Sequence, residues 1–158
     1  MRDRKLRAGL IRAKLTLIEE SIELVNEHLP ENFNEFSCLG LIKDGIYKRT
    51  EFAIENVIDI CAIINSDLGL EMPDSDESIV VSLARAGILT DDMADKIKRM
   101  RGFRNIVLHR YGEIDDRDYM WSPEIYKEES GIAKYNCIAK KTCLINHIAE
   151  VGFRDLNN

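Results

Sequence analysis

The chain has 158 residues and a formal net charge of −6, with 45% hydrophobic and 32% charged residues. This length and composition suit one domain with a sizeable core, which we expect to span residues 1–158. The large negative charge argues against indiscriminate binding of nucleic acid, because it repels phosphate. No apolar run approaches the roughly 20 residues of a membrane span, and no signal-peptide core follows the charged start, so we expect a cytoplasmic protein.

The first two predicted helices are long and amphipathic. Apolar residues spaced alternately by four and three predict a helix from about Ile11 to Leu29, which Pro30 ends. A second helix is predicted from about Glu35 to Asp67, because apolar residues continue along one face throughout this stretch. Its length is typical of a long helix in a helical bundle.

Two shorter helices are predicted next from their capping residues. Asp74, with Glu77 three residues later, resembles a capping box and predicts a short helix that closes near Gly87. Thr90 is followed by two aspartates, which suit the dipole at the start of a helix. We therefore expect a fourth helix from this point to about residue 107 or 108.

The rest of the chain adds one more predicted helix. Gly102 lies inside the fourth predicted helix and indicates a close approach of a neighbouring backbone. Ser122 and Pro123 resemble a helix start, and a last helix is expected from there to about Val151. Strand patterns are nearly absent. The predicted fold class is all-α, an antiparallel bundle of four to five helices.

The cysteines do not suggest a metal centre. None of them has the paired short spacing of a zinc site or a histidine at ligand distance. We expect four reduced thiols, no metal ion and no cofactor; the cysteines are Cys38, Cys61, Cys137 and Cys143.

Basic residues gather in the fourth predicted helix and just after it. No acidic residue lies among them, so a polyanion would have to bind here if it binds the chain at all. The alternative is an ordinary solvated helix face. The cluster comprises Lys96, Lys98, Arg99, Arg101, Arg104 and Arg110.

The same region holds the most informative motif, in which Arg104 and Asn105 are followed by His109 and Tyr111. At about 100° per residue, Asn105 and His109 are neighbours on one helix face, while Arg104 and Tyr111 share a second column. Arginine offers forked donors that suit a phosphodiester, and histidine titrates near neutrality. The pattern favours phosphate-ester chemistry that needs no metal.

Apolar residues separate the polar members of this motif. On the helical wheel Ile106 and Val107 fall on the half opposite the motif. Both of them can therefore belong to the core.

The run from Gly102 through Arg104, Asn105, His109 and Tyr111, at the end of a helix in an all-α chain, resembles the HepT-like branch of the HEPN-domain ribonucleases. These are toxins of the minimal nucleotidyltransferase–HepT toxin–antitoxin system. Arg49 and Glu55 in the second predicted helix add to the resemblance. Residues 115–129 depart from it, because a plain helix is expected where this chain carries an insertion-like stretch.

The resemblance implies a homodimer that cleaves RNA without a metal, by attack of the ribose 2′-hydroxyl. His109 would then act as general base or acid, and Arg104 would stabilise charge on the phosphate. Asn105 would orient the phosphate or His109, and Arg101 would be a supporting cation. It also implies a nucleotidyltransferase antitoxin that transfers AMP to Tyr111. Neither the RNA target nor further assembly of the dimers follows from the sequence.

Each of these residues also has a plain structural interpretation. Arg104 could pair with an acid of the second predicted helix, and Tyr111 could pack on the core. Arg49 lies in an otherwise apolar column, so we expect it to face a cleft or the opposite subunit, with a surface ion pair as the alternative. The rival hypothesis for the whole chain is a non-catalytic helical module that binds a nucleotidyltransferase or a nucleotide.

Overall fold

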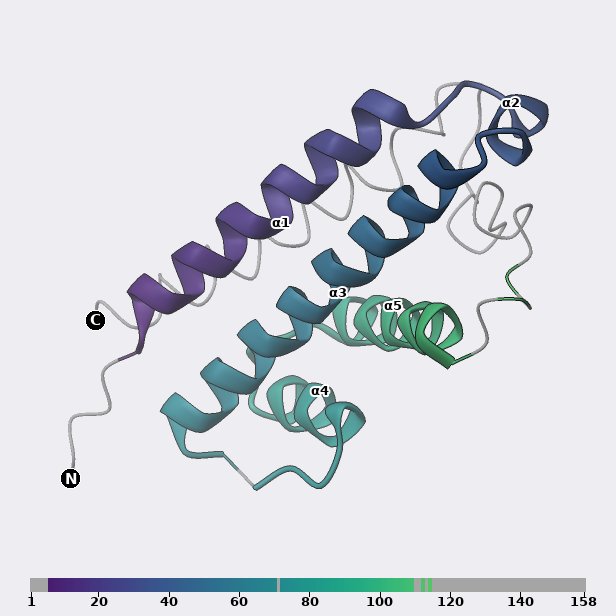
Figure 1. Cartoon of the computed structure of the whole chain (residues 1–158). Coiled ribbons are helices and arrows are strands. Elements are labelled where there is room, and N and C mark those ends of the chain that lie inside the picture. Colours follow the sequence, from purple (N-terminus) through teal and green to yellow (C-terminus); the bar gives the residue numbers. More distant parts are fainter. Residues whose placement is uncertain (1–5, 71, 110–111, 113, 115–158) are drawn as a thin grey trace.

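The computed structural model describes residues 6–70, 72–109, 112 and 114 (Figure 1). No strand occurs within these residues, and the all-α fold class is confirmed. In this part of the chain the helices are α1 (Ala8–His28), α2 (Phe33–Ser37), α3 (Leu41–Leu68), α4 (Asp76–Arg85) and α5 (Asp91–His109). None of these helices is long and apolar enough to cross a membrane.

Helix α3 is the centre of the described fold. It lies antiparallel beside α1 along most of its length, and it also contacts α4 and α5 (Figure 1). Each of these four helices contributes a fully buried aliphatic side chain to one core; these are Ile18, Ile60, Leu83 and Ile97.

Aromatic rings join α2, α3 and α5 at one end of this core. The rings of Phe36 and Tyr47 meet edge to face with centroids 5.8 Å apart, and the centroid of the Phe103 ring lies 6.3 Å from that of Tyr47. Such pairs add roughly 0.5–1.5 kcal/mol each beyond the area that they bury. They fix the helix that carries the candidate site against the centre of the bundle.

The first predicted helix is confirmed as α1, but the second is divided. The chain leaves the helix after Ser37 and enters α3 at Leu41, and Gly40 between them has a φ of 56°. A residue with a side chain would be strained in this left-handed region. Apolar residues keep a helical spacing across the break, which is why periodicity alone predicted one helix.

The start of α4 differs by one residue from its prediction. The cap is Ser75 and not Asp74: its Oγ accepts from the Ser78 N–H at 3.2 Å, and Ser78 Oγ accepts from the Ser75 N–H at 3.1 Å. Ser78 therefore takes the capping role predicted for Glu77, whose carboxylate is left for another partner. The end of this helix is as predicted, with Gly87 at a φ of 74°.

Helix α5 begins as predicted, since Thr90 Oγ1 accepts from the Met93 N–H at 3.2 Å. It continues to His109, slightly further than predicted. The prediction for Gly102 finds no support in the described part of the chain, where a Cβ added there would meet nothing within 4 Å. The predicted helix over residues 122–151 lies outside the described residues.

Candidate active site on helix α5

Arg104 and His109, the two main residues of the motif, lie on different sides of α5. The Arg104 side chain is turned toward α3 and α4 and is only 15% exposed, whereas His109 and Asn105 are exposed in the last turns of the helix. No hydrogen bond or ion pair between described residues joins His109 or Asn105 to Arg104. Five residues of an α-helix correspond to about 140°, which accounts for this separation.

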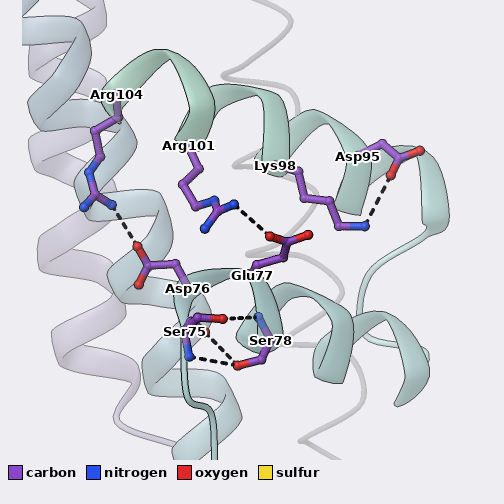
Figure 2. A network of polar contacts seen from close by, with 8 residues as sticks. All are labelled: Ser75, Asp76, Glu77, Ser78, Asp95, Lys98, Arg101 and Arg104. Atoms are coloured by element: carbon purple, nitrogen blue, oxygen red, sulfur yellow. Dashed lines mark hydrogen bonds and ion pairs between the residues drawn. The ribbon is translucent and has the colours of Figure 1, made fainter. Parts of the chain in front are cut away.

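Arg104 is held by two carboxylates from two other helices. Its Nη1 donates to Asp76 Oδ2 of α4 at 3.0 Å (Figure 2), and its Nε lies 3.0 Å from Glu55 Oε2 of α3. The Nε contact is an ion pair without the alignment of a hydrogen bond. The plain alternative for this residue, pairing with an acid of the second predicted helix, is thus present in the structure.

The neighbouring cations are paired as well. Arg101 Nη2 donates to Glu77 Oε2 at 2.9 Å, and Lys98 Nζ lies 3.6 Å from Asp95 Oδ1 (Figure 2). Lys96 Nζ lies 2.5 Å from Asp92 Oδ2. The basic cluster is therefore largely neutralised, by acids that lie outside residues 96–110 in the sequence.

Of the two apolar residues expected on the side of α5 opposite the motif, only one is buried. Val107 is 8% exposed and belongs to the core, whereas Ile106 is 39% exposed and does not. Met93, Ile97 and Met100 fix which side of the helix is buried. Ile106 is rotated by about 100° from Val107 and falls outside that side.

Arg49 lies on a different helix from the motif. It is exposed on α3 at a small cavity of about 30 Å³, whose apolar lining comes from α1, α3 and α5 and includes Ile18 and Met100. The alternative of a surface ion pair is not found, since Arg49 pairs with no acid among the residues that the structure describes. The cavity is too small for a nucleotide and has room for about one water molecule.

The last two predicted site residues are Tyr111 and Arg101. Tyr111 and Arg110 lie outside the described residues. Arg101 is near Arg104 on α5, but its guanidinium is directed to Glu77 (Figure 2). No cluster of three or more potential metal-binding side chains was found in the described ranges.

Asp76 and Glu77 are the contributors that the sequence analysis missed. Glu77 was considered only as part of a capping box, and Asp76 was not considered. The available signal was charge: an acidic stretch, Asp74 to Glu77, precedes the helix that carries the basic stretch, and the two helices pack together. Charge complementarity between consecutive helices would have indicated these pairs.

Comparisons with known proteins agree with this fold and motif. The family described as Ribonuclease HepT-like matches residues 18–121. A candidate RNase of Archaeoglobus fulgidus is 32% identical over 108 residues, which cover 68% of this chain and 80% of that protein. The mRNA nuclease HepT of Shewanella oneidensis is 26% identical over 102 residues, covering 65% of this chain and 76% of the relative.

Solved structures share the fold at low identity. A toxin–antitoxin complex with AMP-PNP superposes with a TM-score of 0.71 at 20% identity, covering 90% of this chain and 96% of the other. A tri-AMPylated HEPN toxin of Shewanella oneidensis, in complex with an MNT antitoxin, gives a TM-score of 0.66 at 20% identity over 90% of this chain and 95% of its own. The fold and motif define a HEPN-type helical protein. This chain belongs to the HepT-like ribonuclease family.

Proposed function

We propose that this chain is a ribonuclease toxin that cleaves RNA without a metal ion, with Arg104 and His109 as its catalytic residues. The observation that carries the proposal is the Arg104–His109 motif, complete at the end of α5 in a chain of the HepT-like family. Relatives described as an RNase and as an mRNA nuclease support the same activity.

The chemistry follows from the two side chains. His109 is exposed and can reach a 2′-hydroxyl, accept its proton and so assist attack on the adjacent phosphorus. The P–O5′ bond breaks, the 5′-oxygen leaves with a proton from a general acid, and a 2′,3′-cyclic phosphate remains. Arg104 stabilises the negative charge that develops on the phosphate oxygens. Asn105 orients the phosphate or His109.

A homodimer accounts for the position of the motif. Arg104 and His109 point to different sides of α5 in one subunit, so a second subunit can supply the complementary half of a site. Arg49, which is exposed and pairs with no described acid, is available to a cleft between subunits.

The partner is a nucleotidyltransferase antitoxin. It transfers AMP from ATP to the hydroxyl of Tyr111 and releases pyrophosphate. The added phosphate carries negative charge close to the motif and repels RNA. Support comes from the similar folds that are described as toxin–antitoxin complexes, one of them a tri-AMPylated toxin.

The first experiment is cleavage of total RNA by the purified protein in EDTA, beside His109→Ala. His28→Ala is a matched control, because His28 is also exposed in the last turn of a helix and bonds only the Leu24 carbonyl. The parent and the control are expected to cut, and His109→Ala is not. Equal cutting by all three would refute a role for His109, and loss of cutting in EDTA would refute metal independence.

Modification is tested separately by mass. Co-expression with the nucleotidyltransferase should add AMP to the parent and none to Tyr111→Phe, which should stay toxic. Full silencing of Tyr111→Phe by the partner would exclude this mechanism.

The second candidate is a non-catalytic module that binds the nucleotidyltransferase. The neutralised cluster on α5 and the net charge of −6 favour it. Its signature is a protein of unmodified mass that binds the partner, cuts no RNA and causes no growth arrest when induced.

A further inference from the structure

The guanidinium of Arg104 has little room for a phosphate in the conformation observed. An arginine can donate hydrogen bonds to two oxygens at once along either of two edges of its guanidinium. One edge is formed by Nε and Nη2, the other by Nη1 and Nη2. Asp76 occupies Nη1 and Glu55 faces Nε, so each edge already has one nitrogen engaged by a carboxylate.

The two edges differ in accessibility. The Nε atom is buried, so the edge that contains it is closed to a bulky ligand such as RNA. The other edge is the one that a phosphodiester can approach, and there Asp76 holds Nη1 at 3.0 Å (Figure 2). The Asp76 side chain is 38% exposed and lies in the first turn of α4, so it can rotate into solvent.

Local charge reinforces this competition. Arg101 and Arg104 face three carboxylates, those of Glu55, Asp76 and Glu77. A phosphate that approaches Arg104 therefore meets a cluster with an excess of negative charge. Displacement of Asp76 from Nη1 relieves part of this repulsion and opens the end of the guanidinium for two hydrogen bonds.

We propose that Asp76 is a positioning residue that competes with RNA phosphate for the Nη1–Nη2 edge of Arg104. In the free protein Asp76 holds the guanidinium in place, and on binding it gives that edge to the phosphodiester. The inference rests on the proposed ribonuclease function and adds to it a residue that sets the affinity for RNA.

The test is Asp76→Asn, which keeps the shape and one acceptor oxygen but removes the charge. Asp95→Asn is the matched control, because it removes the same charge from a side chain that pairs with Lys98 on α5. We measure Kd for a 2′-O-methyl oligoribonucleotide, which cannot be cleaved by 2′-hydroxyl attack, and KM and kcat for the corresponding RNA.

A half-exposed ion pair of the usual strength corresponds to a change of about two- to fivefold in affinity. Asp76→Asn should therefore lower Kd and KM about two- to fivefold with kcat unchanged. Asp76→Glu should restore the parental values, and Asp95→Asn should keep them. In an Arg104→Ala background, Asp76→Asn should no longer tighten binding.

If Asp76→Asn and Asp95→Asn lowered the Kd for RNA equally, the proposal would be overturned, because the change in net charge alone would explain the tighter binding. A lower kcat at unchanged Kd would also overturn it, because Asp76 would then support Arg104 without competing with RNA. Binding without cutting by the parent refutes only the ribonuclease function. The absence of RNA binding in both parent and Asp76→Asn refutes both proposals.

Discussion

Replacement of Arg104 by alanine separates a catalytic role of this residue from a structural one. The side chain makes two contacts, with Glu55 and Asp76, whose side chains are 42% and 38% exposed. Ion pairs of this exposure contribute about 0.2–1 kcal/mol each after solvent screening. Repulsion between the two carboxylates left behind adds to the loss, so Arg104→Ala should lower the free energy of unfolding by about 1–2 kcal/mol.

This loss is small beside the stability of an ordinary domain. A free energy of unfolding of about 5 kcal/mol, at the low end of the usual range, would fall to about 3 kcal/mol and leave about 99% of the chains folded. Tm should fall by about 2–8 °C. Cleavage should fall far more, by about 100- to 1,000-fold, because a donor to the developing charge is lost.

The assay combines denaturant unfolding with RNA cleavage at one temperature. Arg7→Ala is the control: Arg7, just before α1, pairs through its Nε with Asp67 of α3 at 2.8 Å, so its loss breaks an ion pair away from the motif. The control should lose comparable stability and keep its cleavage rate. A loss of cleavage by Arg104→Ala that merely matches the unfolded fraction would refute the catalytic assignment.

Three further predictions concern the fold. Thr90→Ala removes the cap of α5 and should cost about 1 kcal/mol in chemical denaturation, whereas an unchanged midpoint would mean that the cap is dispensable. Ile18→Ala opens a cavity at a fully buried position and should cost about 2–5 kcal/mol; a loss below 1 kcal/mol would contradict this packing. Burial raises the pKa of Cys61 from 9.0 to about 12, so the folded protein should be alkylated at pH 8 on the exposed Cys38 and not on Cys61, as peptide mapping can show. Because the unfolded chain loses this proton near pH 9 and the folded chain keeps it to about pH 12, stability should fall as pH rises through that interval.

The helices were predictable where their signals were local. The apolar stripe of α1 and the Thr90 cap each depend on a few residues along the chain, and both predictions are confirmed. The break before α3 was not predictable from periodicity, because it depends on one glycine at positive φ while the apolar spacing continues. The choice of Ser75 over Asp74 as a cap depends on which side chain reaches the free N–H groups, and the sequence offers both.

The candidate site was predictable in its residues and not in its electrostatics. The motif lies in one stretch of sequence, so its members could be recognised together. Its partners, Glu55 and Asp76, lie on two other helices and meet Arg104 only through the packing of α3, α4 and α5. A count of charges along the chain therefore predicted a basic patch, whereas in the folded protein most of its described cations are paired with acids.

For the proposed ribonuclease, these ion pairs have two opposite effects on the binding of RNA. An unpaired arginine cluster would attract any RNA, and most of that binding would be independent of sequence. Ion pairs to Glu55 and Asp76 reduce that attraction, but they also fix the guanidinium against the bundle before substrate arrives. The entropy of ordering this side chain is thereby already spent in folding, which lowers the cost of engaging Arg104 in the ground state and in the transition state alike. A site built in this way would bind RNA weakly through Arg104 alone, so its affinity must come largely from contacts beyond this cluster.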